Sequence, residues 1–151
     1  MQLTKNISLI EVVPIEIHDK WGDASTWFID PTIVKIAQEL REKFGSVTIN
    51  NKWKGGKYNY RGFRPMTTTV GGKLSQHRFG RALDLSFDES ENEIAAYILQ
   101  NEQKFLEMGL RAIENTNATT NNGEGWLHID CRPMDYDWNK KIKPYIKVVN
   151  P

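Results

Sequence analysis

The sequence predicts an α+β domain in which a small antiparallel sheet has helices packed on one side. Three observations favour this class. Some segments carry apolar residues at helical spacing, several short segments alternate apolar and polar residues as strands do, and a long glycine-rich stretch stands between them. No internal repeat, low-complexity tract or linker divides the chain, so we interpret residues 1–151 as one domain.

The clearest helix is expected to start at Asp30, whose side chain can cap it. Pro31 suits the first helical position because its missing N–H needs no partner there. Gly45 follows the last turn, where glycine most easily adopts the left-handed conformation that ends a helix. The apolar stripe between these signals consists of Ile33, Val34, Ile36, Ala37, Leu40 and Phe44.

A second helix is expected to begin at a capping box formed by Ser90 and Glu93. It should continue to Gly109, with a break near Asn101. Alternating patterns predict the strands, and clusters of Gly, Asn, Thr and Pro predict the loops. The predicted strands lie within 7–17, 46–53, 82–87, 110–114, 126–131 and, as an edge strand, 144–149, and the predicted loops are 54–75 and 115–125.

Composition excludes several classes of function. Lysine plus arginine number 20 and aspartate plus glutamate 19, a balance without the basic patch that nucleic acid or an anionic membrane would need. Cys131 is the single cysteine, so no intramolecular disulfide can form.

Glu11, Pro14 and Glu16 interrupt the N-terminal apolar stretch, and no apolar run is long enough to cross a bilayer. We therefore expect cytoplasmic synthesis without a signal peptide, followed by retention or by release through another route.

Two histidines and one aspartate lie in informative positions. In the predicted strands 82–87 and 126–131, the aliphatic residues share one face, and Asp84 and His128 lie on the opposite face of their strands. If the two strands are neighbours, these side chains converge, and His77 reaches them from the preceding loop. Two imidazoles, one carboxylate and an open fourth position are what a catalytic Zn²⁺ site requires.

Such a site also needs a carboxylate that acts as general base and acid. Asp130 shares the strand face of His128, and Glu124 precedes that histidine by four residues, so either is a candidate. Each also has an ordinary interpretation. Asp130 can bind the backbone or Arg132, and Glu124 can be a solvated loop residue. Glu114 could reach the same face from a neighbouring strand, but we interpret it as a surface carboxylate.

The motif Ser-x-His-x-x-Gly-x-Ala-x-Asp at 75–84, followed by Trp-x-His-x-Asp at 126–130, resembles a known family. It is similar to the VanY-like zinc D,D-carboxypeptidases, the L-alanyl-D-glutamate endopeptidases and the hedgehog signalling domain, over roughly residues 53–132. The resemblance implies a hedgehog/DD-peptidase-like fold, zinc metallopeptidase activity, and Zn²⁺ held by His77, Asp84 and His128.

A third element and one departure refine this resemblance. Gly62-Phe63-Arg64-Pro65 looks like the family's Gly-Tyr-Arg segment, which implies that Arg64 binds the substrate carboxylate or the developing oxyanion. Arg64 can instead pair with a carboxylate near the loop. Many members carry a glutamate base three residues before the second histidine, where this chain has Gly125; others share the His-x-Asp arrangement seen here.

The resemblance leads to two main functional hypotheses. The first is a zinc peptidase that cleaves the stem peptide of bacterial peptidoglycan, as a phage lysin or virion-associated peptidase of the D,D-carboxypeptidase or L-Ala-D-Glu endopeptidase type. The second is a non-catalytic structural or binding component of a virion that keeps the fold and metal site, with other virion proteins as partners. A zinc hydrolase acting on another amide is a third. None of these requires nucleic acid or a membrane.

Overall fold

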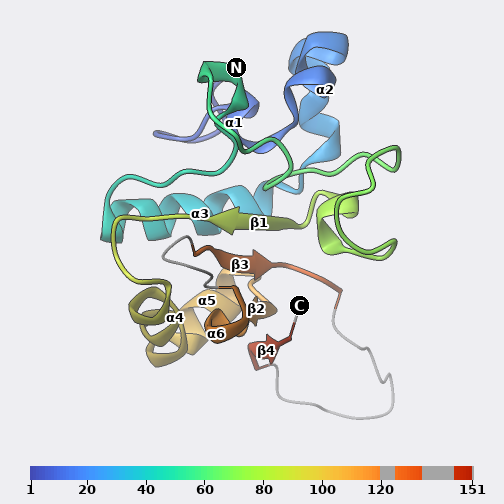
Figure 1. Ribbon diagram of the computed structural model, residues 1–151. Helices are drawn as coiled ribbons and strands as arrows, with labels where there is room; N and C mark the ends of the chain where they lie inside the picture. The colour runs from blue at the N-terminus through green and yellow to red at the C-terminus, as the bar shows by residue number, and fades with distance from the viewer. Residues whose placement is uncertain (120–124, 134–144, 151) are drawn as a thin grey trace.

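The computed structural model describes residues 1–119, 125–133 and 145–150 and has a mixed four-stranded sheet at its centre (Figure 1). The strands are β1 (Ala82–Leu85), β2 (Ala112–Glu114), β3 (Leu127–Asp130) and β4 (Lys147–Val149). Their order across the sheet is β1-β3-β2-β4. β1 and β2 both run antiparallel to β3, which lies between them, whereas β4 runs parallel to β2.

The mixed α/β architecture confirms the expected class in its coarse form, but the expected purely antiparallel sheet is wrong at β4. A parallel neighbour requires a long crossover connection. The connection from β2 to β4 includes β3, so it is long enough to bring β4 back to the edge of the sheet. There β4 pairs with β2 and runs in the same direction. The predicted edge strand itself is confirmed at 147–149.

The two faces of the sheet differ in chemistry. Five aliphatic strand residues form one face and are at most 1% exposed; they are Leu83, Leu85, Ile113, Leu127 and Ile129. They belong to a core cluster that includes apolar residues of helices α3 (Pro31–Phe44), α4 (Glu91–Gln100) and α5 (Glu102–Met108). The helices therefore cover the aliphatic face, as expected, and the opposite face carries Asp84, Glu114, His128 and Asp130.

Helix α3 confirms the clearest sequence prediction. The Asp30 Oδ1 atom accepts a hydrogen bond from the Thr32 N–H at 2.9 Å, and Pro31 occupies the first turn. Gly45 ends the helix with a φ of 86°. The apolar stripe faces inward, and five of its six members are buried: Ile33, Val34, Ile36, Ala37 and Leu40. None of the helices in the described part of the chain combines the length and hydropathy needed to span a membrane.

The predicted strand within 7–17 is wrong. This segment forms α1 (Leu9–Val12) and the start of α2 (Ile15–Trp21), and a 3₁₀ helix, η1 (Gly22–Phe28), follows them. A capping box starts α1, because Ser8 and Glu11 bond to each other across the first turn, with Ser8 N to Glu11 Oε2 at 2.8 Å. Helical spacing then buries Leu9 and Val12 together.

The predicted strand at 46–53 is reduced to one isolated bridge between Thr48 and Ser86. Two backbone hydrogen bonds of 2.8 and 2.9 Å join these residues. Val47 and Ile49 are buried as the alternation predicted, but the chain then turns into the 3₁₀ helix η2 (Lys52–Lys54). The alternating pattern identified Val47 and Ile49 as buried but failed beyond them, because Asn50 is buried and Trp53 is 40% exposed.

The second helical region has the extent that was predicted, but of the expected capping box the described contacts include the Ser90 cap and no bond from the Glu93 side chain. Asn101 separates α4 from α5, and Gly109 ends α5 with a φ of 106°. Ser90 caps α4 by accepting a hydrogen bond from the Asn92 N–H at 3.2 Å. The predicted loop 115–125 contains a short helix, α6 (Thr116–Thr119), and residues 120–124, Glu124 among them, lie outside the described residues.

One arginine bonds to the glycine-rich loop at three points. Arg78 lies in the 3₁₀ helix η3 (Gln76–Phe79). Its guanidinium donates hydrogen bonds to the carbonyl oxygens of Gly72, Pro65 and Thr68, at 3.0, 2.9 and 3.0 Å. Three loop carbonyls that lie outside any helix or sheet are thus bound by a single side chain, and those of Pro65 and Gly72 also accept backbone N–H groups. The loop is thereby fixed beside the polar face of the sheet.

Gly80 sets the turn between η3 and β1, and its replacement by alanine should destabilise the protein. Its φ of 67° is left-handed, and a Cβ atom there would lie 1.8 Å from the Phe28 carbonyl oxygen. We expect Gly80→Ala to cost about 1–3 kcal/mol of unfolding free energy. Chemical denaturation measures this, with Gly72→Ala as the matched control, because a Cβ at Gly72 would meet no atom within 4 Å. Equal stability of the two variants would contradict the prediction.

Candidate metal centre

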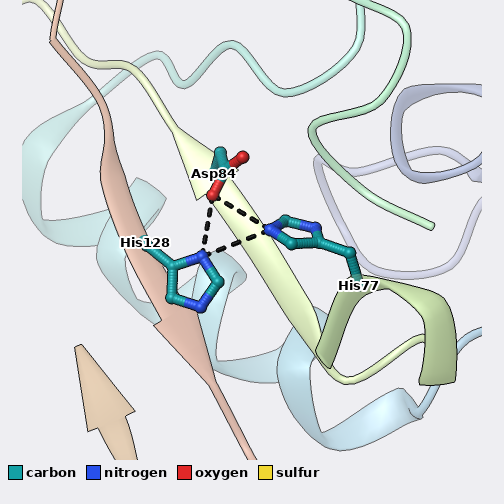
Figure 2. Close-up of side chains that lie close together, drawn as sticks. All are labelled: His77, Asp84 and His128. Carbon is teal, nitrogen blue, oxygen red and sulfur yellow. Dashed lines mark hydrogen bonds and ion pairs between the residues drawn. The ribbon is translucent and has the colours of Figure 1, made fainter. Parts of the chain in front are cut away.

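Three buried side chains converge on the polar face of the sheet (Figure 2). Asp84 comes from β1, His128 from β3 and His77 from η3. His77 Nε2 lies 3.1 Å from Asp84 Oδ1 and 3.2 Å from His128 Nδ1, and His128 Nδ1 lies 2.8 Å from Asp84 Oδ1. We call these three atoms the donor triangle. The convergence that the strand parities predicted is therefore present.

The pairing of β1 with β3 produces two sides of this triangle. Asp84 stands directly opposite His128 in the antiparallel register. Their neighbours Leu83 and Leu85 point into the core, so the two polar side chains must share the other face. His77 is brought in by η3, which Gly80 ends with its left-handed conformation.

Each histidine has its other nitrogen occupied. His77 Nδ1 lies 2.8 Å from the Gly62 carbonyl oxygen, which can only accept, so Nδ1 carries the proton and Nε2 presents a lone pair. His128 Nε2 lies 3.2 Å from Asp130 Oδ2, so this nitrogen donates and Nδ1 is left facing the triangle. Contacts of this kind, to a carbonyl or a carboxylate, are what orient metal-binding histidines.

The donor triangle has the dimensions of a metal site. Metal–donor bonds of about 2.0–2.1 Å in a tetrahedral arrangement separate neighbouring donor atoms by about 3.3 Å. The three separations here are 2.8, 3.1 and 3.2 Å. Two imidazole nitrogens and one carboxylate oxygen suit a divalent transition metal. His77, Asp84 and His128 thus form a buried group that could hold a metal ion.

Arg64 binds the remaining oxygen of Asp84. Its Nη2 donates to Asp84 Oδ2 at 2.7 Å, and its Nε donates to the Tyr60 carbonyl oxygen at 2.6 Å. A Cβ atom added at Gly71 would meet Arg64 Nη1 at 2.6 Å, so the guanidinium lies against the loop. Arg64 therefore makes the carboxylate pairing that the sequence left open, and it also lines the pocket described below.

Asp130 lies on the far side of the His128 ring from the donor triangle. It is fully buried, and Arg132 donates to it from the backbone N–H, from Nε at 2.8 Å and from Nη2. These contacts match the ordinary interpretation of Asp130 and add a role in holding His128. The role of Asp130 as catalytic base stays a prediction, and so does that of Glu124, outside the described residues.

A pocket of about 410 Å³ opens onto the donor triangle. Loop 71–77 forms one wall, and the ends of β2 and β4 contribute to another. Glu114 lies in this lining with a side chain 18% exposed, and its Oε1 is 4.0 Å from His128 Nδ1. Besides the triangle, Arg64 and Glu114, the lining residues are Gly71, Gly72, Leu74, Ser75, Gln76, Trp126, Arg132, Val149 and Asn150.

The position of Glu114 was underestimated from the sequence. Ile113 is buried in the core, so the next residue along β2 must point to the polar face. That signal is readable in the alternation of 110–114. The pairing of β2 with β3 places Glu114 next to His128. That pairing cannot be read from the alternation of one segment.

The electrostatics of the metal-free site are dominated by charge pairing. Burial would raise the pKa of Asp84, but its electrostatic interaction with His77 and its hydrogen bonds with both histidines hold that pKa far below its usual range. Burial would likewise lower the pKa of His128, yet its contacts with Asp130 and Asp84 raise it to about 9. Without a metal, a proton on His128 therefore supplies the positive charge that the carboxylates require.

Neither a scan against protein-family models nor searches of curated proteins and of solved structures finds a significant match to this chain.

Removal of a donor should abolish metal binding, and removal of a supporting contact should only weaken it. We expect His128→Ala to lose Zn²⁺ in titration calorimetry. Asp130→Asn should retain the ion with an affinity lower by roughly 10–100-fold, because the carboxylate only orients the imidazole. His18→Ala is the control, since His18 in α2 is not among the described residues that line the pocket. Unaltered affinity in His128→Ala would refute the donor assignment.

The metal-free protein should lose stability as pH rises from about 6.5 to about 9. The folded-state pKa of His128 lies above its unfolded value, so its contribution is fully present below pH 6.5 and is lost as the group deprotonates. The loss should approach about 3 kcal/mol. Urea denaturation across this range measures it in the presence of chelator, and His128→Gln should remove the pH-dependent part. A flat profile in the unsubstituted protein would contradict the assignment.

Proposed function

We propose that this chain is a zinc-dependent peptidase that hydrolyses an amide bond in the stem peptide of bacterial peptidoglycan. The observation that carries the proposal is the buried His77, Asp84 and His128 group at the base of an open pocket. The resemblance of the motifs at 75–84 and 126–130 to zinc D,D-carboxypeptidases and L-alanyl-D-glutamate endopeptidases supports the substrate class. It also supports a setting in a phage lysin or a virion-associated peptidase.

The proposed reaction needs a metal ion, a positive charge near the substrate and a carboxylate that transfers a proton. His77, Asp84 and His128 would hold Zn²⁺, which when bound polarises a carbonyl and lowers the pKa of water. Arg64 adds a positive charge beside Asp84 in the lining of the pocket, where it favours a substrate carboxylate or a developing oxyanion. A carboxylate must also take and return one proton. Asp130 and Glu124 are the candidates that the motifs suggest.

One observation favours a second function. Asp130 is fully buried and engaged by Arg132, and it contacts the nitrogen of His128 that faces away from the donor triangle. A site without a base in reach of the attacking water would keep its metal but not turn over. The alternative is therefore a non-catalytic structural or binding component of a virion with the same metal site.

Hydrolysis of purified peptidoglycan decides between these functions. We expect the zinc-loaded protein to release new amino groups, because each cut amide frees one amine. Chelator should abolish the release, and added Zn²⁺ should restore it. Mass analysis of the fragments names the bond and separates a carboxypeptidase from an endopeptidase. His128→Ala is the negative control. If a folded, zinc-loaded protein releases nothing, the peptidase proposal fails and the structural role is favoured.

A further inference from the structure

We propose that Glu114 on β2 is the carboxylate that accepts the proton of the attacking water, a role that the sequence motifs suggest for Asp130 or Glu124. This inference rests on the proposed peptidase function and names the general base that the proposed reaction requires. It is carried by the position of Glu114 relative to the donor triangle, by its place in the pocket and by the contacts that occupy Asp130.

The register of the sheet brings Glu114 to the site. β2 pairs with β3 so that Ala112 stands opposite Asp130 and Ile113 opposite Ile129. One residue further along, Glu114 is level with His128. Ile113 points into the core, and Glu114 therefore points to the face that holds Asp84 and His128.

Distances place Glu114 beside the donor triangle and outside it. Its Oε1 lies 4.0 Å from His128 Nδ1, whereas the three donor atoms are separated by 2.8–3.2 Å. A fourth metal donor would be expected at the spacing of the other three donor atoms. The longer distance of Glu114 Oε1 from His128 Nδ1 fits a group that bonds to a water or substrate held beside the triangle. Glu114 also lines the pocket and keeps 18% of its side chain exposed, so substrate and water can reach it.

Asp130 fails the same geometric test. It contacts His128 through Nε2, the nitrogen that faces away from the donor triangle. It is fully buried, three hydrogen bonds from Arg132 reach its oxygens, and it is not among the described residues that line the pocket. Its place is that of a residue that positions His128.

The proposed step balances with one carboxylate. Water loses a proton to Glu114 while its oxygen bonds to the carbonyl carbon of the substrate. The carbon–nitrogen bond then breaks, and the same proton passes from Glu114 to the leaving nitrogen. An amide and a water become a carboxylic acid and an amine, and Glu114 is again a carboxylate.

Glu114→Gln tests the inference, because glutamine keeps the size of the side chain and cannot accept the proton. We expect kcat on peptidoglycan fragments to fall by roughly 10²–10⁴-fold. KM and the affinity for Zn²⁺ should stay within about threefold, because the residue binds neither substrate nor metal in the ground state. Glu107→Gln, on the exposed surface of α5, is the matched control and should leave all three quantities unchanged.

A second readout does not depend on turnover. Acetohydroxamic acid gives up a proton when it binds a metal as an anion, and a neighbouring carboxylate can take that proton. Its affinity for zinc-loaded Glu114→Gln should fall by at least about tenfold, the loss expected when a charged hydrogen-bond partner becomes neutral.

The outcomes separate this inference from the proposed function. If the unsubstituted protein cuts peptidoglycan and Glu114→Gln cuts it equally well, the inference is overturned and the peptidase function stands. If Glu114→Gln loses zinc, Glu114 is a ligand and the inference is also overturned. If the unsubstituted protein cuts nothing, the peptidase proposal fails, and the hydroxamate affinity alone decides whether Glu114 accepts a proton at the metal.

Discussion

The antiparallel register between β1 and β3 is the constraint on which the site depends. Asp84 faces His128 across that pair, and a slip of one residue would turn one of them into the core. The slip is opposed by the aliphatic face of the same two strands, where Leu83, Leu127 and their neighbours are fully buried. The hydrophobic burial that stabilises the sheet therefore also fixes the spacing of two donor atoms.

A second set of contacts comes from outside the sheet. The Gly62 carbonyl oxygen holds His77, Arg64 holds Asp84, and Asp130 with Arg132 holds His128. Each donor side chain is thus tied at its other polar atom, and the donor triangle is oriented before any ion arrives. The arrangement concentrates negative charge, and a proton on His128 and a metal ion are two ways to neutralise it.

The sequence predicted those parts of the molecule in which local signals agree with one another. For helix α3 the sequence predicted the Asp30 cap, the apolar face and the end at Gly45, and the structure contains all three. Strand parity predicted the faces of Asp84 and His128 because side-chain alternation is a local property. The strand expected within 7–17 is a helix instead. A run of aliphatic residues is compatible with a strand or a helix, and the Ser8–Glu11 capping box favours the helix. The neighbours of β3 depend on long-range pairing, so the sequence allowed Glu114 to reach the site but favoured a surface carboxylate.

The three hydrogen bonds of Arg78 have a consequence for affinity. A glycine-rich wall would ordinarily be flexible, and a ligand that pressed against it would lose binding energy to the ordering of the backbone. With Pro65, Thr68 and Gly72 already tied to one guanidinium, part of that ordering is present in the free protein. The wall formed by loop 71–77 is preorganised, so a substrate that fits the pocket can bind with little entropic penalty from the protein.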